Sequence, residues 1–231
     1  MLKDIIRSVK LIAYTQSAKA NIIGSAICVV LGVILQFINI ALERKFGNIF
    51  GYMDVGGYFV MIGIVILLSP VLRLGFSKNV DSSPYRVFLN KNFPALLTFF
   101  TIAGTVLVET VIGSLGLLAF PDGAETICSS ITATAISGLV LVGFSSLIYK
   151  LPFWLYIIDI ILISITINML SYFPEELMHL ISGESVLRSF VFGMLSAVIS
   201  SLIIRFISVF LYRKNYSGFW KKTVEKQESM Q

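Results

Sequence analysis

Long apolar segments separated by short polar stretches repeat along the whole chain. Each is about as long as the roughly 20 mostly apolar residues that a helix needs to cross a bilayer. Together they use most of the 231 residues and leave no room for a separate soluble domain. The pattern predicts an all-α membrane protein with one transmembrane domain (1–231) and six transmembrane helices, at about 20–42, 57–76, 94–119, 128–148, 151–172 and 187–212.

Three polar stretches carry helical signals of their own. In residues 2–18 apolar positions recur every three or four residues and the basic residues fall elsewhere, which predicts an amphipathic helix in the plane of the membrane surface. Residues 77–93 hold a Ser-Pro helix start and predict a short cytoplasmic helix. Asn92 then fits the N-cap of the third span and Pro94 its first turn. Residues 173–186 predict a short external helix, because a proline and two glutamates suit a helix start.

Successive segments between the predicted spans are alternately rich and poor in Lys and Arg. Basic residues are frequent before the first span, after the second and in the tail, and sparse in the turns after the third and fifth. Cytoplasmic loops of membrane proteins are rich in Lys and Arg. Both termini are therefore expected in the cytoplasm, with 213–231 as a cytoplasmic tail, and the compact form fits a bacterial cytoplasmic membrane.

The composition agrees with membrane insertion, and the positive net charge can be explained without a nucleic-acid partner. Hydrophobic residues make up 56% of the chain and the mean hydropathy is +0.88. The net charge of +5 is explained by cytoplasmic loops that face anionic membrane lipid. We therefore expect lipid, and no nucleic acid, among the partners of the chain.

Charged residues inside apolar segments are candidates for function. Glu109 lies on one face of the third span with Thr98, Thr101 and Thr105, at spacings of three and four residues. This face must avoid lipid. It either lines a gate or substrate pathway or packs against a neighbouring helix through a carboxyl bonded to a hydroxyl.

Asp159 and Arg205 form a second candidate pair. Each lies roughly 10–12 Å from the cytoplasmic end of its span by helical rise. Consecutive helices often pack together, so we expect a structural ion pair that lowers the cost of two intramembrane charges. A proton-carrying role for this pair is less favoured.

Helix-contact faces are expected wherever small and polar residues recur every three or four positions. The first span holds such a face, and the fourth and sixth spans hold others. That of the first span comprises Gly24, Cys28, Gly32, Gln36 and Asn39, and that of the fourth span comprises Ser130, Thr134, Ser137, Gly138 and Ser145. Packing within the chain explains these faces as well as a subunit interface does.

Familiar catalytic patterns are missing from the sequence. His179 is the one histidine, with no other ligand at metal-binding spacing, and no metal site is expected. There is no Gly-rich loop followed by Lys and Ser or Thr that would bind ATP, and no Ser-His-acid set. The chain is predicted not to be an enzyme and to bind no cofactor itself.

The order of these elements resembles the membrane subunits of type-2 ABC exporters. The resemblance is architectural and lies in Leu2–Ala18 as the elbow helix, Ser82–Asn92 as the coupling helix and Pro174–Ser182 as the external hairpin. It implies export of a peptide, drug-like or lipid-like substrate. It also implies ABC ATPase subunits that carry ATP and Mg²⁺, and a second permease copy or a homologous permease. The ATPase would contact the coupling helix through Tyr85, Arg86, Phe88 and Leu89.

Other kinds of membrane protein share the size and the number of spans. One is the substrate-binding membrane subunit of a vitamin importer, which has no long cytoplasmic segment like 77–93 to act as a lever on the spans. Another is a proton-coupled secondary carrier that uses Glu109 or Asp159. A non-transport assembly or immunity protein also fits.

Overall fold

Residues 18–46, 55–74, 85–119, 123–150, 161, 165 and 185–212 are described by a computed structural model. All of its regular structure within these ranges is helical. The long helices are α2 (Ala18–Phe46), α3 (Val55–Leu74), α6 (Phe93–Ala119), α7 (Ala124–Gly138) and α10 (Val186–Leu211). Shorter pieces extend two of them: α5 (Tyr85–Val87), the π-helix η1 (Phe88–Asn92), the π-helix η3 (Leu139–Phe144) and the 3₁₀-helix η4 (Ser145–Lys150).

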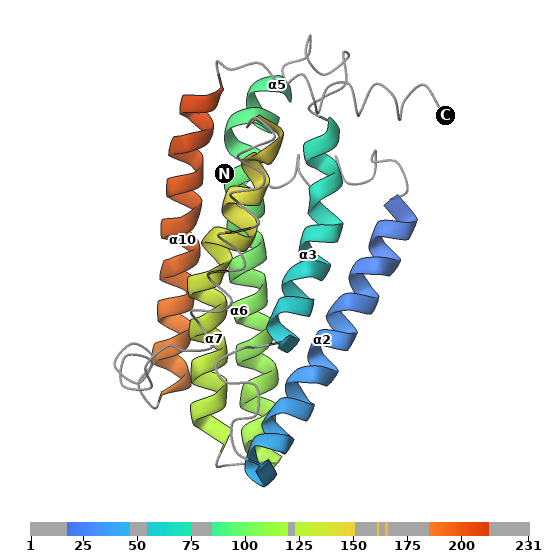
Figure 1. The fold of residues 1–231 in the computed structure, drawn as a ribbon, viewed down its shortest axis with the longest axis vertical. Helices are drawn as coiled ribbons and strands as arrows, with labels where there is room; N and C mark the ends of the chain where they lie inside the picture. Colours follow the sequence, from blue (N-terminus) through green and yellow to red (C-terminus); the bar gives the residue numbers. More distant parts are fainter. Residues whose placement is uncertain are drawn as a thin grey trace.

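The long helices stand side by side as a bundle (Figure 1). One end of the bundle holds α5, the start of α2 and the end of α3, and we name it the α5 end. The opposite end holds the end of α6 and the starts of α7 and α10. The two pairs with the most extensive contact are α2 with α3 and α6 with α10. α7 packs against both α6 and α10, so these three helices form one packed group.

Five helical stretches among the described residues are long and apolar enough to cross a membrane. They coincide with the predicted first, second, third, fourth and sixth spans. η4 ends at the α5 end and α10 starts at the opposite end (Figure 1). The predicted fifth span, 151–172, falls between them in sequence and lies outside the described residues, apart from Ile161 and Ile165. The predicted amphipathic helix (2–18) and external helix (173–186) also lie outside them.

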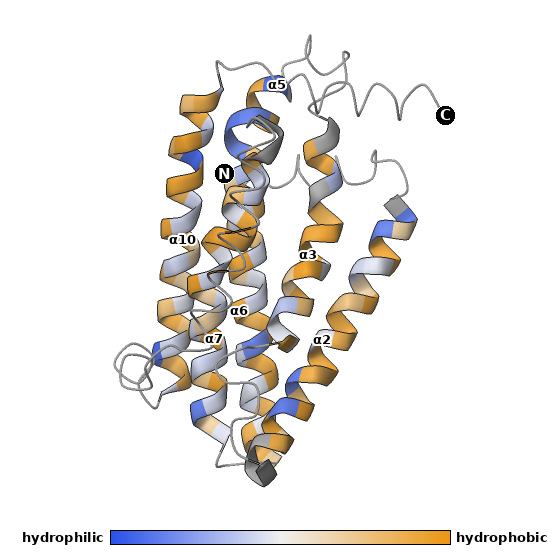
Figure 2. Cartoon of the chain, viewed as in Figure 1, coloured by the Kyte–Doolittle hydropathy of each residue, from blue (hydrophilic) through white to orange (hydrophobic). Residues whose placement is uncertain are grey.

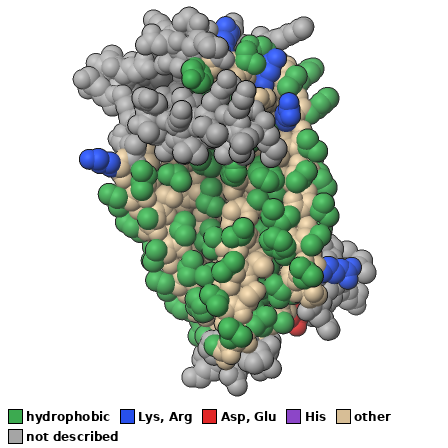
Figure 3. Space-filling view, turned by 180° about the vertical axis from the view of Figure 1, so that it is seen from behind, with side chains coloured by type: hydrophobic (Ala, Val, Ile, Leu, Met, Phe, Trp, Pro, Cys, Tyr) green, Lys and Arg blue, Asp and Glu red, His purple; other side chains and the backbone are tan. Residues whose placement is uncertain are grey.

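Most residues of the long helices are hydrophobic (Figure 2), and apolar side chains cover much of the face shown in Figure 3. Large exposed hydrophobic residues are most numerous on α2 and α10, for example Ile23, Val30, Leu195 and Phe206. Such a surface would aggregate in water, because monomeric soluble proteins rarely expose large contiguous apolar patches. Lipid tails are an apolar solvent for it, and the described helices are those of an integral membrane protein.

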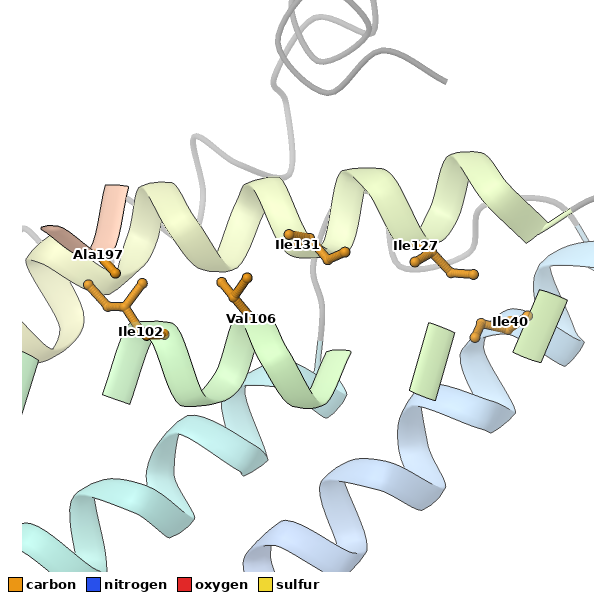
Figure 4. Close-up of a cluster of buried hydrophobic side chains, with 7 residues drawn as sticks. Ile40, Ile102, Val106, Ile127, Ile131 and Ala197 are labelled. Atoms are coloured by element: carbon orange, nitrogen blue, oxygen red, sulfur yellow. The ribbon is translucent and has the colours of Figure 1, made fainter. Parts of the chain in front are cut away.

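The core of the bundle comprises two groups of buried apolar side chains. The first lies where α2, α6, α7 and α10 meet, and six of its members are labelled in Figure 4: Ile40, Ile102, Val106, Ile127, Ile131 and Ala197. The second lies nearer the α5 end and comprises Met61, Val71, Phe88, Leu89, Phe93, Leu97 and Val142. The second group joins η1 to α3 and η3.

The third span begins earlier than its sequence predicts. Tyr85–Ala119 is one unbroken apolar helical stretch, and Asn92 is helical rather than an N-cap. The predicted helix start at Asn92 and Pro94 is therefore wrong. Phe93 N–H donates its hydrogen bond to the carbonyl of Phe88, five residues back. This π-type bond precedes Pro94, which has no N–H to give.

Candidate functional site

The polar face of α6 points into the bundle. Thr98, Thr101 and Thr105 are fully buried and Glu109 is 2% exposed. The hydroxyl of Thr98 donates to the carbonyl of Pro94 at 2.9 Å, and that of Thr105 donates to the carbonyl of Thr101 at 2.8 Å. Such bonds to the preceding turn satisfy a buried hydroxyl within its own helix. Thr98 and Thr105 are thus satisfied within α6, whereas the buried hydroxyl of Thr101 makes no hydrogen bond among the described residues.

Glu109 is joined to α7. The hydroxyl of Thr134 donates a hydrogen bond of 2.6 Å to Glu109 Oε1, and both residues are buried. α7 is itself fixed to α10 by a hydrogen bond of 2.7 Å from Ser196 Oγ to the carbonyl of Ala135. These two bonds cross helices, and they lie one residue apart on α7. The carboxyl of Glu109 thus lies within the packed group of α6, α7 and α10.

A small cavity opens beside Glu109. It has a volume of about 20 Å³ and is lined by Gln36, Asn39, Ile40, Glu109, Gly113, Thr126, Ile127 and Ser130. We name it the polar cavity, because five of these eight residues have oxygen-bearing polar side chains. A volume of roughly 10–15 Å³ on this measure is enough for one water molecule. The polar cavity therefore has room for one water-sized species.

The polar cavity joins residues that the sequence placed on three separate faces. Gln36 and Asn39 come from the predicted contact face of α2, Glu109 from α6, and Ser130 from α7. Thr126 was not among the predicted candidates. It lies in the first turn of α7, where a threonine is equally typical of an exposed helix end, so the sequence holds no signal for it.

A larger groove lies between α6 and α10. Its volume is about 350 Å³, and its lining includes Asn92, Leu96, Phe99, Leu202 and Arg205. The side chain of Arg205 is exposed. Asp159, its predicted ion-pair partner, lies outside the described residues, so the pairing stays a prediction.

The residues predicted to contact an ATPase fall into two environments. Tyr85 is 43% exposed and Arg86 is also exposed, whereas Phe88 and Leu89 are each 3% exposed. The buried pair belongs to the second core group, where Phe88 makes an edge-on ring contact with Phe93. Of the four, Tyr85 and Arg86 present a surface to a partner. Val87, exposed beside them, was not predicted.

No group of three or more His, Cys, Asp or Glu side chains within the described ranges is placed to hold a metal ion. Cys28 and Cys128 are both free thiols. Comparison of the chain with protein-family models, curated proteins and solved structures finds no match.

Proposed function

We propose that this chain is the transmembrane permease subunit of an ATP-driven exporter. Separate ABC ATPase subunits would hydrolyse ATP with Mg²⁺, and a second permease copy or a homologous permease would complete the pathway. The substrate would be a peptide, a drug-like molecule or a lipid-like molecule. One observation carries this proposal: a single helical stretch connects an exposed polar end at Tyr85 and Arg86 to the buried carboxyl of Glu109.

That stretch has the geometry of a lever. From Tyr85 to Glu109 it extends about 36 Å at the rise of an α-helix. Lys91 near its exposed end places its ammonium nitrogen 4.1 Å from the ring centroid of Tyr212, at the end of α10. Such cation–π contacts contribute about 0.5–2 kcal/mol. A partner that displaces α5 would therefore move α6 and α10 together.

The charge of the two ends supports a cytoplasmic partner at the α5 end. Lys19, Arg86, Lys91 and Arg205 lie in elements of that end. At the opposite end, the last turn of α2 holds Glu43, Arg44 and Lys45, the first turn of α7 holds Glu125 and the first turn of α10 holds Arg188, so acidic residues offset most of the basic charge there. An excess of basic residues is typical of the cytoplasmic side. The proposed orientation thus places α5 where a soluble ATPase can reach it.

The test is co-purification from the native host in mild detergent, with mass spectrometry of the bound chains. We expect a stoichiometric ABC ATPase with the unmodified protein and its loss with Arg86→Glu. Arg188→Glu is the matched control, because it makes the same charge change at the opposite end and should retain the ATPase. A chain that purifies without any ATPase would overturn the proposal.

The second candidate is a proton-coupled secondary carrier. The burial of Glu109 against Thr134, with the polar cavity beside it, favours this candidate. A carrier would transport in proteoliposomes that contain no ATPase, driven by a proton gradient, and Glu109→Gln would abolish that transport. Dependence of transport on ATP and a partner would exclude it.

A further inference from the structure

The groove between α6 and α10 has a polar end and an apolar end. The two helices are antiparallel, because α6 starts near the α5 end and α10 ends there (Figure 1). Of the lining residues, Asn92 and Arg205 lie nearest the α5 end, and Phe99 and Val198 lie seven residues from them along each helix. The groove therefore extends about 10 Å from a basic end towards the middle of the bundle.

This groove opens on the outer surface of the bundle. On its α10 wall, Val198 is 44% exposed, Leu202 is 58% exposed, and Arg205 is exposed as well. Its volume of about 350 Å³ falls in the range of small-molecule sites, roughly 300–1,000 Å³. Lipid tails are the solvent of an exposed apolar surface in a membrane. A lipid can therefore enter the groove from the bilayer without passing through the bundle.

Arg205 places a positive charge inside a spanning helix, about 9 Å from the end of α10 by helical rise. Such a charge is costly unless a negative group lies nearby. The acidic side chains of the described ranges are Glu43, Glu109 and Glu125, and none of them lies at the α5 end. Asp159, the predicted partner, lies outside those ranges. The exposure of Arg205 favours a negative group that comes from the surrounding lipid.

We propose that the groove between α6 and α10 binds one anionic phospholipid of the leaflet at the α5 end. The guanidinium of Arg205 would hold the phosphate, since its parallel N–H groups match two phosphate oxygens. An arginine inside a span can also extend its charged group towards the headgroups. Asn92 and Ser201 line the groove beside it and can donate hydrogen bonds to headgroup oxygens. One acyl chain would lie along Leu96 and Phe99.

A headgroup with net negative charge fits this groove better than a zwitterionic one, because it neutralises the guanidinium and leaves no charge over. Bound lipid would join α6 to α10 within two turns of the contact between Lys91 and Tyr212. It would thus add a second link between the two helices. Lipid binding requires no ATPase, and so its failure and the failure of the proposed function are separate results.

The experiment measures thermal unfolding of the full chain, purified with whatever chains accompany it, in detergent micelles that contain phosphatidylglycerol or phosphatidylcholine with the same acyl chains. Phosphatidylglycerol should raise the Tm saturably, by roughly 5–10 °C at one hundred times the mole fraction that gives half-saturation. Phosphatidylcholine should do much less.

Two arginine variants test the headgroup contact. Arg205→Gln should abolish the difference between the two lipids. In phosphatidylcholine its Tm should equal or exceed that of the unmodified protein, because an intramembrane charge has been removed. Arg188→Gln is the matched control, because it makes the same change at the opposite end of the same helix. It should keep the full response to phosphatidylglycerol.

Two leucine variants test the acyl-chain contact. Leu202→Trp fills the apolar part of the groove and should raise the half-saturating mole fraction at least tenfold. Leu195→Trp is its matched control, because Leu195 lies on the same helix, is 56% exposed against 58% for Leu202, and does not line the groove.

Three outcomes would overturn the proposal. The first is an equal Tm of the unmodified protein in the two lipids. The second is a lower Tm of Arg205→Gln in both lipids, which is the result expected if Arg205 pairs with Asp159. The third is a full lipid response in Leu202→Trp, which would mean that phosphatidylglycerol acts on the charged surface in general and not in the groove.

Discussion

Two threonines of α7 use their hydroxyl groups differently. Both Thr132 and Thr134 are fully buried. Thr132 donates to the carbonyl of Cys128 in its own helix at 2.8 Å, whereas Thr134 donates across the bundle to Glu109. A carbonyl that loses a side-chain donor can keep its helical hydrogen bond. The bond from Thr134 to Glu109 joins two helices, so its loss also removes a link between α6 and α7.

Thr134→Val should therefore destabilise the protein by about 1–3 kcal/mol, the cost of removing one partner of a buried hydrogen bond. Thr132→Val replaces the same side chain at the same burial and should cost no more than about 1 kcal/mol. Chemical denaturation in mixed micelles, followed by far-ultraviolet circular dichroism, measures both. Equal losses for the two variants would show that the contact with Glu109 adds no stability.

At the scale of elements, glycine sets how closely α2 approaches α3. A Cβ atom built on Gly32 would lie 2.7 Å from the carbonyl oxygen of Gly56 and 2.9 Å from the backbone nitrogen of Val60. Backbone atoms cannot move aside as a flexible side chain can. Small residues let membrane helices pack closely in this way. The sequence placed Gly32 on a contact face, and α3 occupies that face.

Gly32→Ala should separate α2 from α3 and destabilise the protein by about 1–3 kcal/mol, as overpacking does. Gly24→Ala makes the same change on the same helix, where the added Cβ would meet only Ile66 Cγ2, at 3.7 Å. That control should be neutral or slightly stabilising, because alanine favours helix over glycine by up to about 1 kcal/mol. Thermal unfolding of the two purified variants distinguishes them, and a neutral Gly32→Ala would contradict the close contact.

The first turns of the third span contain both a buried residue, Leu89, and an exposed residue, Tyr85. Leu89→Ala removes part of the second core group and should cost about 2–5 kcal/mol. Tyr85→Ala, at the exposed end, should change stability by no more than about 0.5 kcal/mol. Denaturation curves of the two variants test this. A charged substitution at Phe88 or Leu89 is expected to disrupt folding for the same reason, so it is unsuitable as a test of coupling to an ATPase.

At the scale of the whole molecule, the proposed orientation places the α5 end in the cytoplasm and the opposite end outside the cell. A reagent that cannot cross the membrane should therefore reach only the opposite end in intact cells. In a background with Cys28→Ala and Cys128→Ala, a membrane-impermeant thiol reagent should label Glu125→Cys in intact cells. It should label Arg86→Cys only after the membrane is opened. Both positions are exposed on the surface of the bundle. Labelling of Arg86→Cys in intact cells would reverse the orientation and remove α5 from the reach of a cytoplasmic ATPase.

Some of this architecture could be predicted from the sequence and some could not. Glu109 was identifiable because a charge in an apolar segment is rare, and its bond to a neighbouring hydroxyl was one of two expected roles. Its meeting with Gln36 and Asn39 could not be predicted, because the rotation of α2 depends on close contacts such as Gly32 with Gly56. The start of the third span was mislocated because Asn92 before Pro94 has the same pattern in a helix cap and in a π-helical turn.

The unequal burial of the helices has a consequence for biosynthesis. A smaller share of α2 than of the stretch Ala124–Leu147, which holds α7, is buried. α2 can leave the translocon before the later helices, because its surface outside the contact with α3 is mostly exposed and apolar. α7 hides threonines and serines that lipid cannot solvate. α6 is synthesised before α7 and carries Glu109 and three buried threonines. It should therefore stay beside the insertion machinery until α7 emerges as its partner, and the two should enter the bilayer as a hairpin.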